Sequence, residues 1–151
     1  MSAAGQEHEG HAGRADHAAH SHQDLRYFAP DAQPEVVATD AQVKFPHPVG
    51  AARVEEVVRA YLGRLSDALV ASGCVLVGHI KGVVAAEKGD ELAFSLTSLH
   101  GVPQISGGLQ DGGAHFRLTL NVIVFGVDPD ALPGIVTAAW PDGVTASWRP
   151  D

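Results

Sequence analysis

Histidine is the residue type whose number and spacing most suggest chemistry in this sequence. Nine of the 151 residues are histidines, and five of these lie near the beginning: His8, His11, His17, His20 and His22. Imidazole nitrogens are preferred ligands of nickel, zinc and copper, and nearby carboxylates can complete the coordination. Because several of these histidines are two or three residues apart, a flexible chain can bring them to one ion. We therefore expect this segment to bind a divalent transition metal (Ni, Zn or Cu), weakly because it is not preorganised.

The segment that carries these histidines is predicted to be a disordered leader. Residues 1–23 contain no Leu, Ile, Val, Phe, Trp, Tyr or Cys, so folding would bury too little apolar surface to offset the lost chain entropy. We place the leader at residues 1–32 and a single folded domain at 33–151. In composition the leader resembles the histidine-rich tails of nickel chaperones and metal-storage proteins. A solubilising tail with no ligand, or a tail whose charge changes sign with pH, are the alternatives.

The composition of the whole chain excludes several classes of protein. The formal net charge is -8, which argues against a general nucleic-acid binder and against a polybasic membrane binder. No apolar run approaches the roughly 18 residues that a membrane-spanning helix needs. The single cysteine, Cys74, excludes an internal disulfide framework. The leader has no apolar core of a secretory signal. We expect a cytoplasmic protein with neither nucleic acid nor membrane as its partner.

The clearest folded element is a helix over residues 51–72. Its apolar residues form one stripe at helical spacing: Val54, Val57, Val58, Tyr61, Leu62, Leu65 and Leu69. Ser72-Gly73 indicates its end. Strands are predicted at three later segments: 74–86, 91–99 and 114–127.

The remaining segments carry weaker patterns. Residues 25–48 contain four prolines, and we expect them to lie against the domain as extended chain, with a short strand at 43–45. The glycine-rich residues 101–113 are predicted to be a flexible connection. A short helix or strand is expected at 134–140, and a short strand at 144–148. Together these elements predict an α+β two-layer sandwich, with one amphipathic helix on a three- to four-stranded, mainly antiparallel sheet.

The sheet face turned away from this helix is predicted to be polar. It would carry the following side chains: His79, Lys81, Ser95, Thr97, His115, Arg117, Thr119 and Asn121. A solvated antiparallel face has such a composition. The same face could instead bind a small anionic ligand, with Lys81 and Arg117 as anchors and His79 and His115 beside them. It could also be an interface, and we expect a homo-oligomer or a protein partner docked there.

Catalytic patterns are absent from the sequence. No serine lies in a nucleophile elbow, and no zinc-protease or paired-cysteine motif occurs. Cys74 precedes a predicted buried strand, so we interpret it as a packing residue. We therefore expect a non-catalytic accessory or binding protein. One alternative is a structural subunit of a larger complex with no role for metal. Another is a small enzyme that uses His79, His100 or His115 around the glycine-rich loop.

Overall fold

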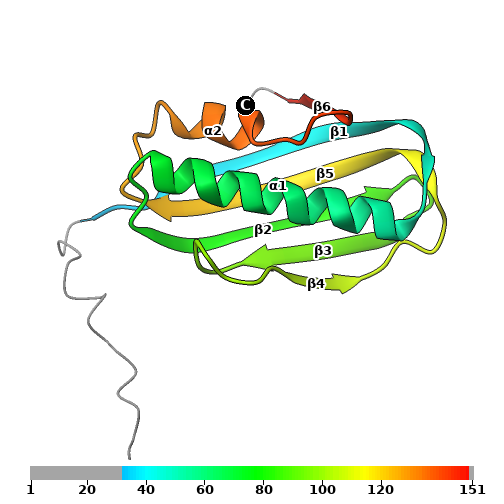
Figure 1. Ribbon diagram of the computed structural model, residues 1–151, viewed down its shortest axis with the longest axis horizontal. Helices are drawn as coiled ribbons and strands as arrows, with labels where there is room; N and C mark the ends of the chain where they lie inside the picture. The colour runs from blue at the N-terminus through cyan, green and yellow to red at the C-terminus, as the bar shows by residue number, and fades with distance from the viewer. Residues whose placement is uncertain (1–31, 150–151) are drawn as a thin grey trace, which may run out of the picture. The chain divides into compact units, whose positions relative to one another are not determined.

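One antiparallel sheet with two helices makes up the described part of the chain (Figure 1). The computed structural model describes residues 32–149. In chain order the elements are β1 (Glu35–Val49), α1 (Ala51–Ala71), β2 (Leu76–Ala86), β3 (Glu91–Leu96), β4 (Gln104–Gly107), β5 (Gly113–Phe125), α2 (Leu132–Ala138) and β6 (Thr145–Trp148). The six strands pair in the order β4-β3-β2-β5-β1-β6, and all neighbours are antiparallel.

The predicted sandwich of one helix on three to four strands is wrong, because the sheet has six strands and two helices pack on it. The largest difference is β1, a strand of 15 residues where the sequence predicted extended chain with a short strand. Its ladder with β5 runs without interruption to Lys44 and resumes only at Val49. Pro46 and Pro48 lie in this gap, so their missing N–H groups remove no ladder hydrogen bond. The glycine-rich segment also contains a strand, β4.

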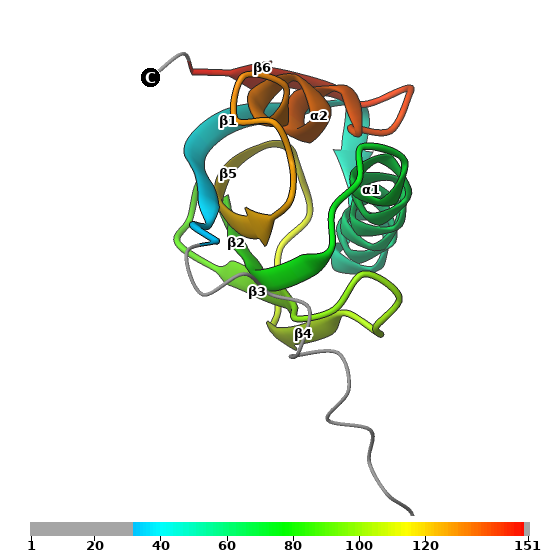
Figure 2. The ribbon, with the colours of Figure 1, turned by 90° about the vertical axis from the view of Figure 1, so that its left-hand side faces the viewer.

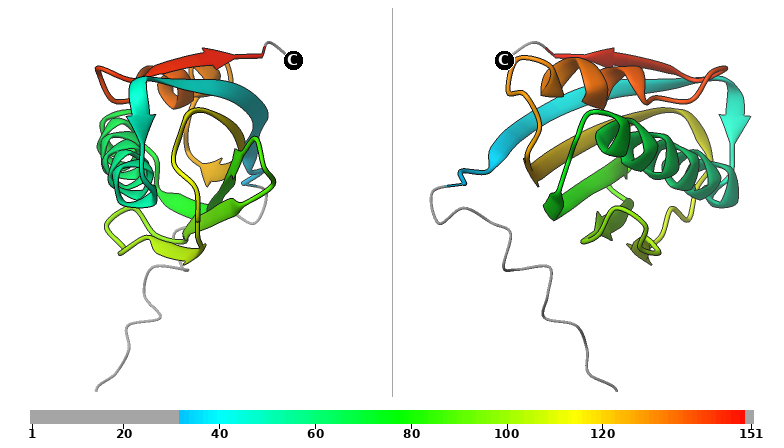
Figure 3. Two further views of the ribbon diagram at one scale, coloured as in Figure 1. Left: turned by 90° about the vertical axis from the view of Figure 1, so that its right-hand side faces the viewer. Right: turned by 60° about the vertical axis from the view of Figure 1, so that its left-hand side comes forward.

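Helix α1 lies where its apolar stripe predicts, and it packs on one face of the sheet. The sheet curls so that β1 and β6 lie on one side of α1 and β3 and β4 on the other (Figures 2 and 3). Alternate residues of the long strands are buried beneath the helix, for example Leu118, Leu120 and Val122 of β5. Gly73, with φ of 85°, ends the helix in a conformation that favours glycine.

Helix α2 and strand β6 are joined to α1 by an aromatic cluster. The Tyr61 hydroxyl donates a hydrogen bond of 2.9 Å to the carbonyl of Val136 on α2. The Tyr61 ring lies 5.1 Å from the ring of Trp140 and 6.4 Å from that of Trp148, centroid to centroid. Trp140 Nε1 donates to the carbonyl of Val144 at 3.0 Å. Each buried polar group of this cluster therefore has a partner, as burial requires.

The other face of the sheet, which we call the outer face, is not covered by either helix. Its side chains on the central strands are exposed or half-buried, whereas their neighbours in sequence are buried. Of the side chains predicted for this polar face, Thr97 does not lie on the sheet, because β3 ends before it. None of the helices within residues 32–149 is both long enough and apolar enough to span a membrane.

Candidate functional site

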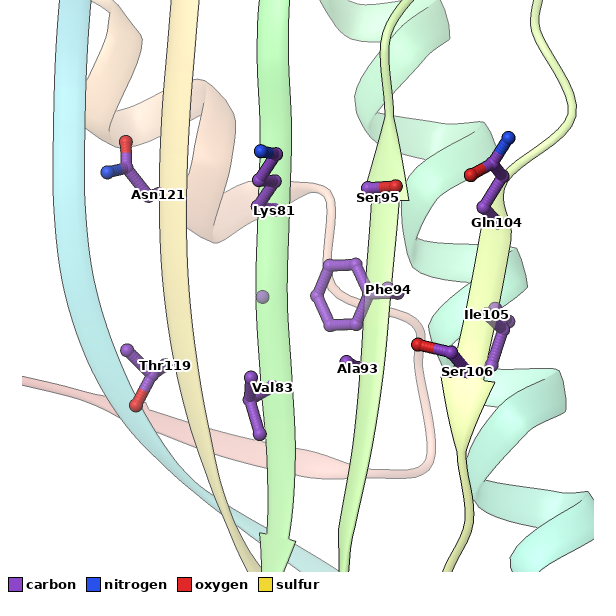
Figure 4. A pocket seen from close by; sticks show the side chains of 11 residues that line it. Lys81, Val83, Ala93, Phe94, Ser95, Gln104, Ile105, Ser106, Thr119 and Asn121 are labelled. Atoms are coloured by element: carbon purple, nitrogen blue, oxygen red, sulfur yellow. The ribbon is translucent and has the colours of Figure 1, made fainter.

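Two rows of small and polar side chains run across the outer face from β5 to β4. The antiparallel register places them side by side, because residues paired across a ladder lie on the same face. The first row consists of Asn121, Lys81, Ser95 and Gln104. The second row consists of Thr119, Val83, Ala93 and Ser106. Figure 4 shows the two rows crossing β5, β2, β3 and β4, which are neighbours in the sheet.

These two rows line an open depression of about 770 Å³, which we call the outer hollow (Figure 4). Three of the lining side chains are small: Ala93 and Ser95 on β3, and Ser106 on β4. Long side chains at these positions would fill the space above the sheet. The volume lies within the range of about 300–1,000 Å³ that is usual for sites that bind small molecules.

The floor of the outer hollow depends on a glycine. Gly82 faces the core on β2, directly across the ladder from Phe94 on β3. A Cβ at Gly82 would lie 2.3 Å from Phe94 Cζ and 2.7 Å from the Thr119 carbonyl oxygen. Only glycine therefore leaves room for the ring of Phe94 at this point. Val83 and Ala93 face the hollow directly, whereas Phe94, which is 3% exposed, and its ladder partner Ile105 face the core side and border the hollow only from beneath.

Among residues 32–149, Lys81 is the only ionisable side chain that lines the outer hollow. Within residues 32–149 it makes no ion pair with a carboxylate. Its neighbours across the two ladders are neutral, Asn121 on β5 and Ser95 on β3. Asp40 on β1 lies directly beside Thr119 in the second row, just outside the hollow, and its Oδ1 accepts a hydrogen bond of 2.8 Å from Thr119. The hollow thus presents one exposed positive charge among neutral groups.

The structure does not bring together the predicted anchors Lys81 and Arg117 or the two histidines expected beside them. Arg117 and His115 line a separate depression of about 360 Å³, which they share with Glu87 and Glu91. His79 is paired with Ile123 on β5. His115 lies eight residues from Ile123 along the same strand, which corresponds to about 27 Å at about 3.4 Å per residue. Only Lys81 lies in the outer hollow.

The remaining sequence candidates lie partly inside and partly outside the described residues. His8, His11, His17, His20 and His22 lie outside residues 32–149. Within that range, no group of three or more His, Cys, Asp or Glu side chains is placed to hold a metal ion. His100 was a candidate catalytic residue in the alternative that the protein is a small enzyme. It lines a different groove, between α1 and the segment that follows β3.

A nucleophile with an activating base is not present in the described residues. Cys74 is buried, its Sγ donates to the carbonyl of Leu76 at 3.4 Å, and burial raises the pKa of its thiol. Ser95 lies opposite Lys81 in the ladder, but no hydrogen bond joins the two side chains and Lys81 is exposed. A serine nucleophile needs such a bond to a base in order to lose its proton.

Sequence reasoning missed the residues that shape the hollow, Gly82, Ala93, Phe94 and Ile105. A signal was present in β3, where large residues alternate with Ala93 and Ser95. Small side chains on one face of a strand mark a place where that face can be hollow.

Comparison of the chain with protein-family models, with curated proteins and with solved structures gives no match. The function therefore has to be inferred from the geometry of the outer hollow and from the sequence.

Proposed function

We propose that this protein is a non-catalytic binding protein whose domain holds a small, largely apolar organic molecule in the outer hollow. The observation that carries this proposal is the combination of the apolar side chains of Val83 and Ala93, with Phe94 beneath them, and a rim of amide, hydroxyl and amino groups. Sites for small organic molecules have this composition, in which apolar walls supply affinity and a few polar groups fix orientation.

The absence of catalysis is part of the same proposal. It is supported by the exposed Lys81, which has no hydrogen bond to Ser95, and by the separation of Lys81 from His115. General acid–base or nucleophilic catalysis needs its groups within hydrogen-bond reach of one another or of the substrate.

The proposal is tested by filling the hollow. Ala93 is half-buried at its centre and faces outward, so Ala93→Trp adds a large side chain to the hollow and not to the core. The probe is 1-octanol, followed by backbone amide chemical shifts of the full chain. We expect shifts at the residues that line the hollow, and their loss in Ala93→Trp.

A matched control is Thr145→Trp, an exposed position on β6 outside the hollow, which should keep the shifts of the native protein. The absence of octanol-induced shifts at the hollow of the native protein would refute the proposal. A native dimer that Ala93→Trp converts to a monomer in sedimentation experiments would show that a second copy occupies the outer face, and would also refute it.

We further propose that the leader binds a divalent transition metal, on the evidence of its five closely spaced histidines. The test is calorimetric titration of the full chain with Ni, Zn and Cu, before and after replacement of His8, His11, His17, His20 and His22 by Ala. Loss of binding supports the leader as the site, and equal affinity in both proteins removes it.

We place the protein in the cytoplasm, a proposal supported by its single cysteine. Cys74 is a free, buried thiol, and the described domain is folded without a disulfide. Microscopy of the full chain carrying a fluorescent tag tests this location, and signal outside the cytoplasm contradicts it.

A further inference from the structure

The single positive charge of the outer hollow lies beside its apolar floor, and this arrangement selects one class of ligand. We infer that the ligand is an amphiphilic monoacid, an apolar body with one carboxylate, whose carboxylate binds at Lys81. This inference rests on the proposed function, since it names the ligand of the same hollow.

The charge pattern of the described residues favours an anion at Lys81. Four other basic side chains form ion pairs, for example Arg59 with Glu55 at 2.8 Å and Lys88 with Asp111 at 3.0 Å. Lys81 forms none, as is also true of Lys44, Arg117 and Arg149, but Lys81 lines the hollow and none of the described residues that line it is acidic. A carboxylate beside Lys81 would gain a charge-assisted hydrogen bond without displacing an existing partner.

The neighbours of Lys81 can add hydrogen bonds to the same carboxylate. Asn121 and Ser95 lie in its row, on either side of Lys81 (Figure 4). An amide and a hydroxyl both donate to carboxylate oxygens, which have about four acceptor sites in all. The row therefore offers three side chains that can donate to one acidic group.

The direction of the apolar body follows from the order of the strands. Lys81 lies on β2, and beyond it the small side chains of Ala93 on β3 and Ser106 on β4 face the hollow, with Phe94 and Ile105 beneath them on the core side. From β5 to β4 the hollow crosses three strand spacings, about 14 Å at about 4.8 Å each. The body of the ligand thus extends from Lys81 toward β4, across the floor above Phe94.

A monoacid fits the hollow better than a phosphate or a dicarboxylate does. A second negative charge would find no second cation among the described lining residues, and Asp40 lies beside Thr119 at the edge of the hollow. The hollow also contains no helix N-terminus, the feature with which many proteins bind phosphate.

The test compares an acid and an alcohol of the same chain length, octanoate and 1-octanol, on the full chain. The native protein should bind octanoate about tenfold more tightly, as expected for a hydrogen bond to a charged group. Lys81→Met keeps an unbranched side chain and removes the charge. It should lower octanoate affinity about tenfold and leave octanol affinity unchanged.

Lys44→Met is the matched control, because Lys44 lies on the same outer face, on β1, opposite His115 and outside the hollow. It should change neither affinity. The inference is overturned if the native protein binds octanoate and octanol equally, or if Lys81→Met keeps the full preference for octanoate. In either case, binding of octanol in the hollow still supports the proposed function. If neither octanoate nor octanol changes the amide chemical shifts of the residues that line the hollow, the proposed function and this inference both fail.

Discussion

The ring of Phe94 occupies the space in which a side chain at Gly82 would lie. These residues are partners across the β2–β3 ladder, and a Cβ at position 82 would lie 2.3 Å from Phe94 Cζ. A missing side chain on one strand thus admits a large ring from the next. The pair closes the sheet beneath the outer hollow and holds its floor in place.

We predict that Gly82→Ala destabilises the domain. The added methyl group meets the Phe94 ring and also the Thr119 carbonyl oxygen at 2.7 Å, and the latter belongs to the backbone of a central strand. Overpacking of this kind typically costs about 1–3 kcal/mol. Urea denaturation should show a lower midpoint with an unchanged slope.

Gly63→Ala is the control for this prediction. Gly63 lies in the middle of α1 and is exposed, and a methyl group added there would have no neighbouring atom within 4 Å. Alanine should raise the free energy of unfolding by up to about 1 kcal/mol, because its helix propensity exceeds that of glycine. Equal effects of the two substitutions would contradict the close contact at Gly82.

We predict that Tyr61→Phe weakens the attachment of α2. The substitution removes the 2.9 Å hydrogen bond to the Val136 carbonyl and leaves that buried oxygen without this donor. The expected loss is about 1–2 kcal/mol in the free energy of unfolding. Hydrogen exchange should also become faster in α2 than in β2. An unchanged stability would show that the bond contributes nothing net.

We predict a loss of stability at alkaline pH that depends on Tyr61. Burial raises the pKa of the Tyr61 phenol above its ordinary value of 10.0, so above that pH the unfolded chain releases a proton that the folded chain retains. Stability is complete below pH 10 and falls as pH rises, by at most about 1.4 kcal/mol per pH unit. Urea titrations at pH 8 and pH 11 give the free energy of unfolding at each pH. Its decrease between the two should be smaller in Tyr61→Phe than in the native protein.

We predict that the thiol of Cys74 is unreactive in the folded protein. Burial raises its pKa, which lowers the fraction of the reactive thiolate, and only 8% of the residue is exposed. Because Cys74 is the only cysteine, its reaction with Ellman's reagent reports on one site. Labelling should be slow in buffer and rapid in urea, and equal rates would contradict the burial.

The sequence could predict the elements whose patterns are local. The stripe of α1 places seven apolar residues on one face, and all of them are buried in the structure. The alternation of β5 likewise separates its buried residues from its outer ones. In β1 the pattern is weaker, because Thr39 and Ala41 occupy inward positions and two prolines follow Lys44. Proline normally argues against a central strand, and only the register shows that these prolines lie outside the ladder.

The outer hollow could not be predicted, because its members come from four strands. Sequence reasoning placed Lys81 and Asn121 on the outer face, but the lateral neighbours of Lys81 depend on the register of two ladders. A shift of one residue in either ladder would turn alternate residues to the other face. Strand β4, which places Gln104 and Ser106 beside β3, could not be predicted, because Ile105 is its only residue of strong strand propensity.

Strand β5 has a consequence for how this chain folds. It lies between β2 and β1, so without it the sheet divides into β4-β3-β2 and β1-β6. Its pairing with β1 joins residues as far apart in sequence as Glu35 and Val124. Closing such long loops costs chain entropy before the contacts form, which slows folding. During synthesis, the edge of β1 that pairs with β5 therefore remains unpaired until β5 has left the ribosome. By then nearly the whole domain has been synthesised.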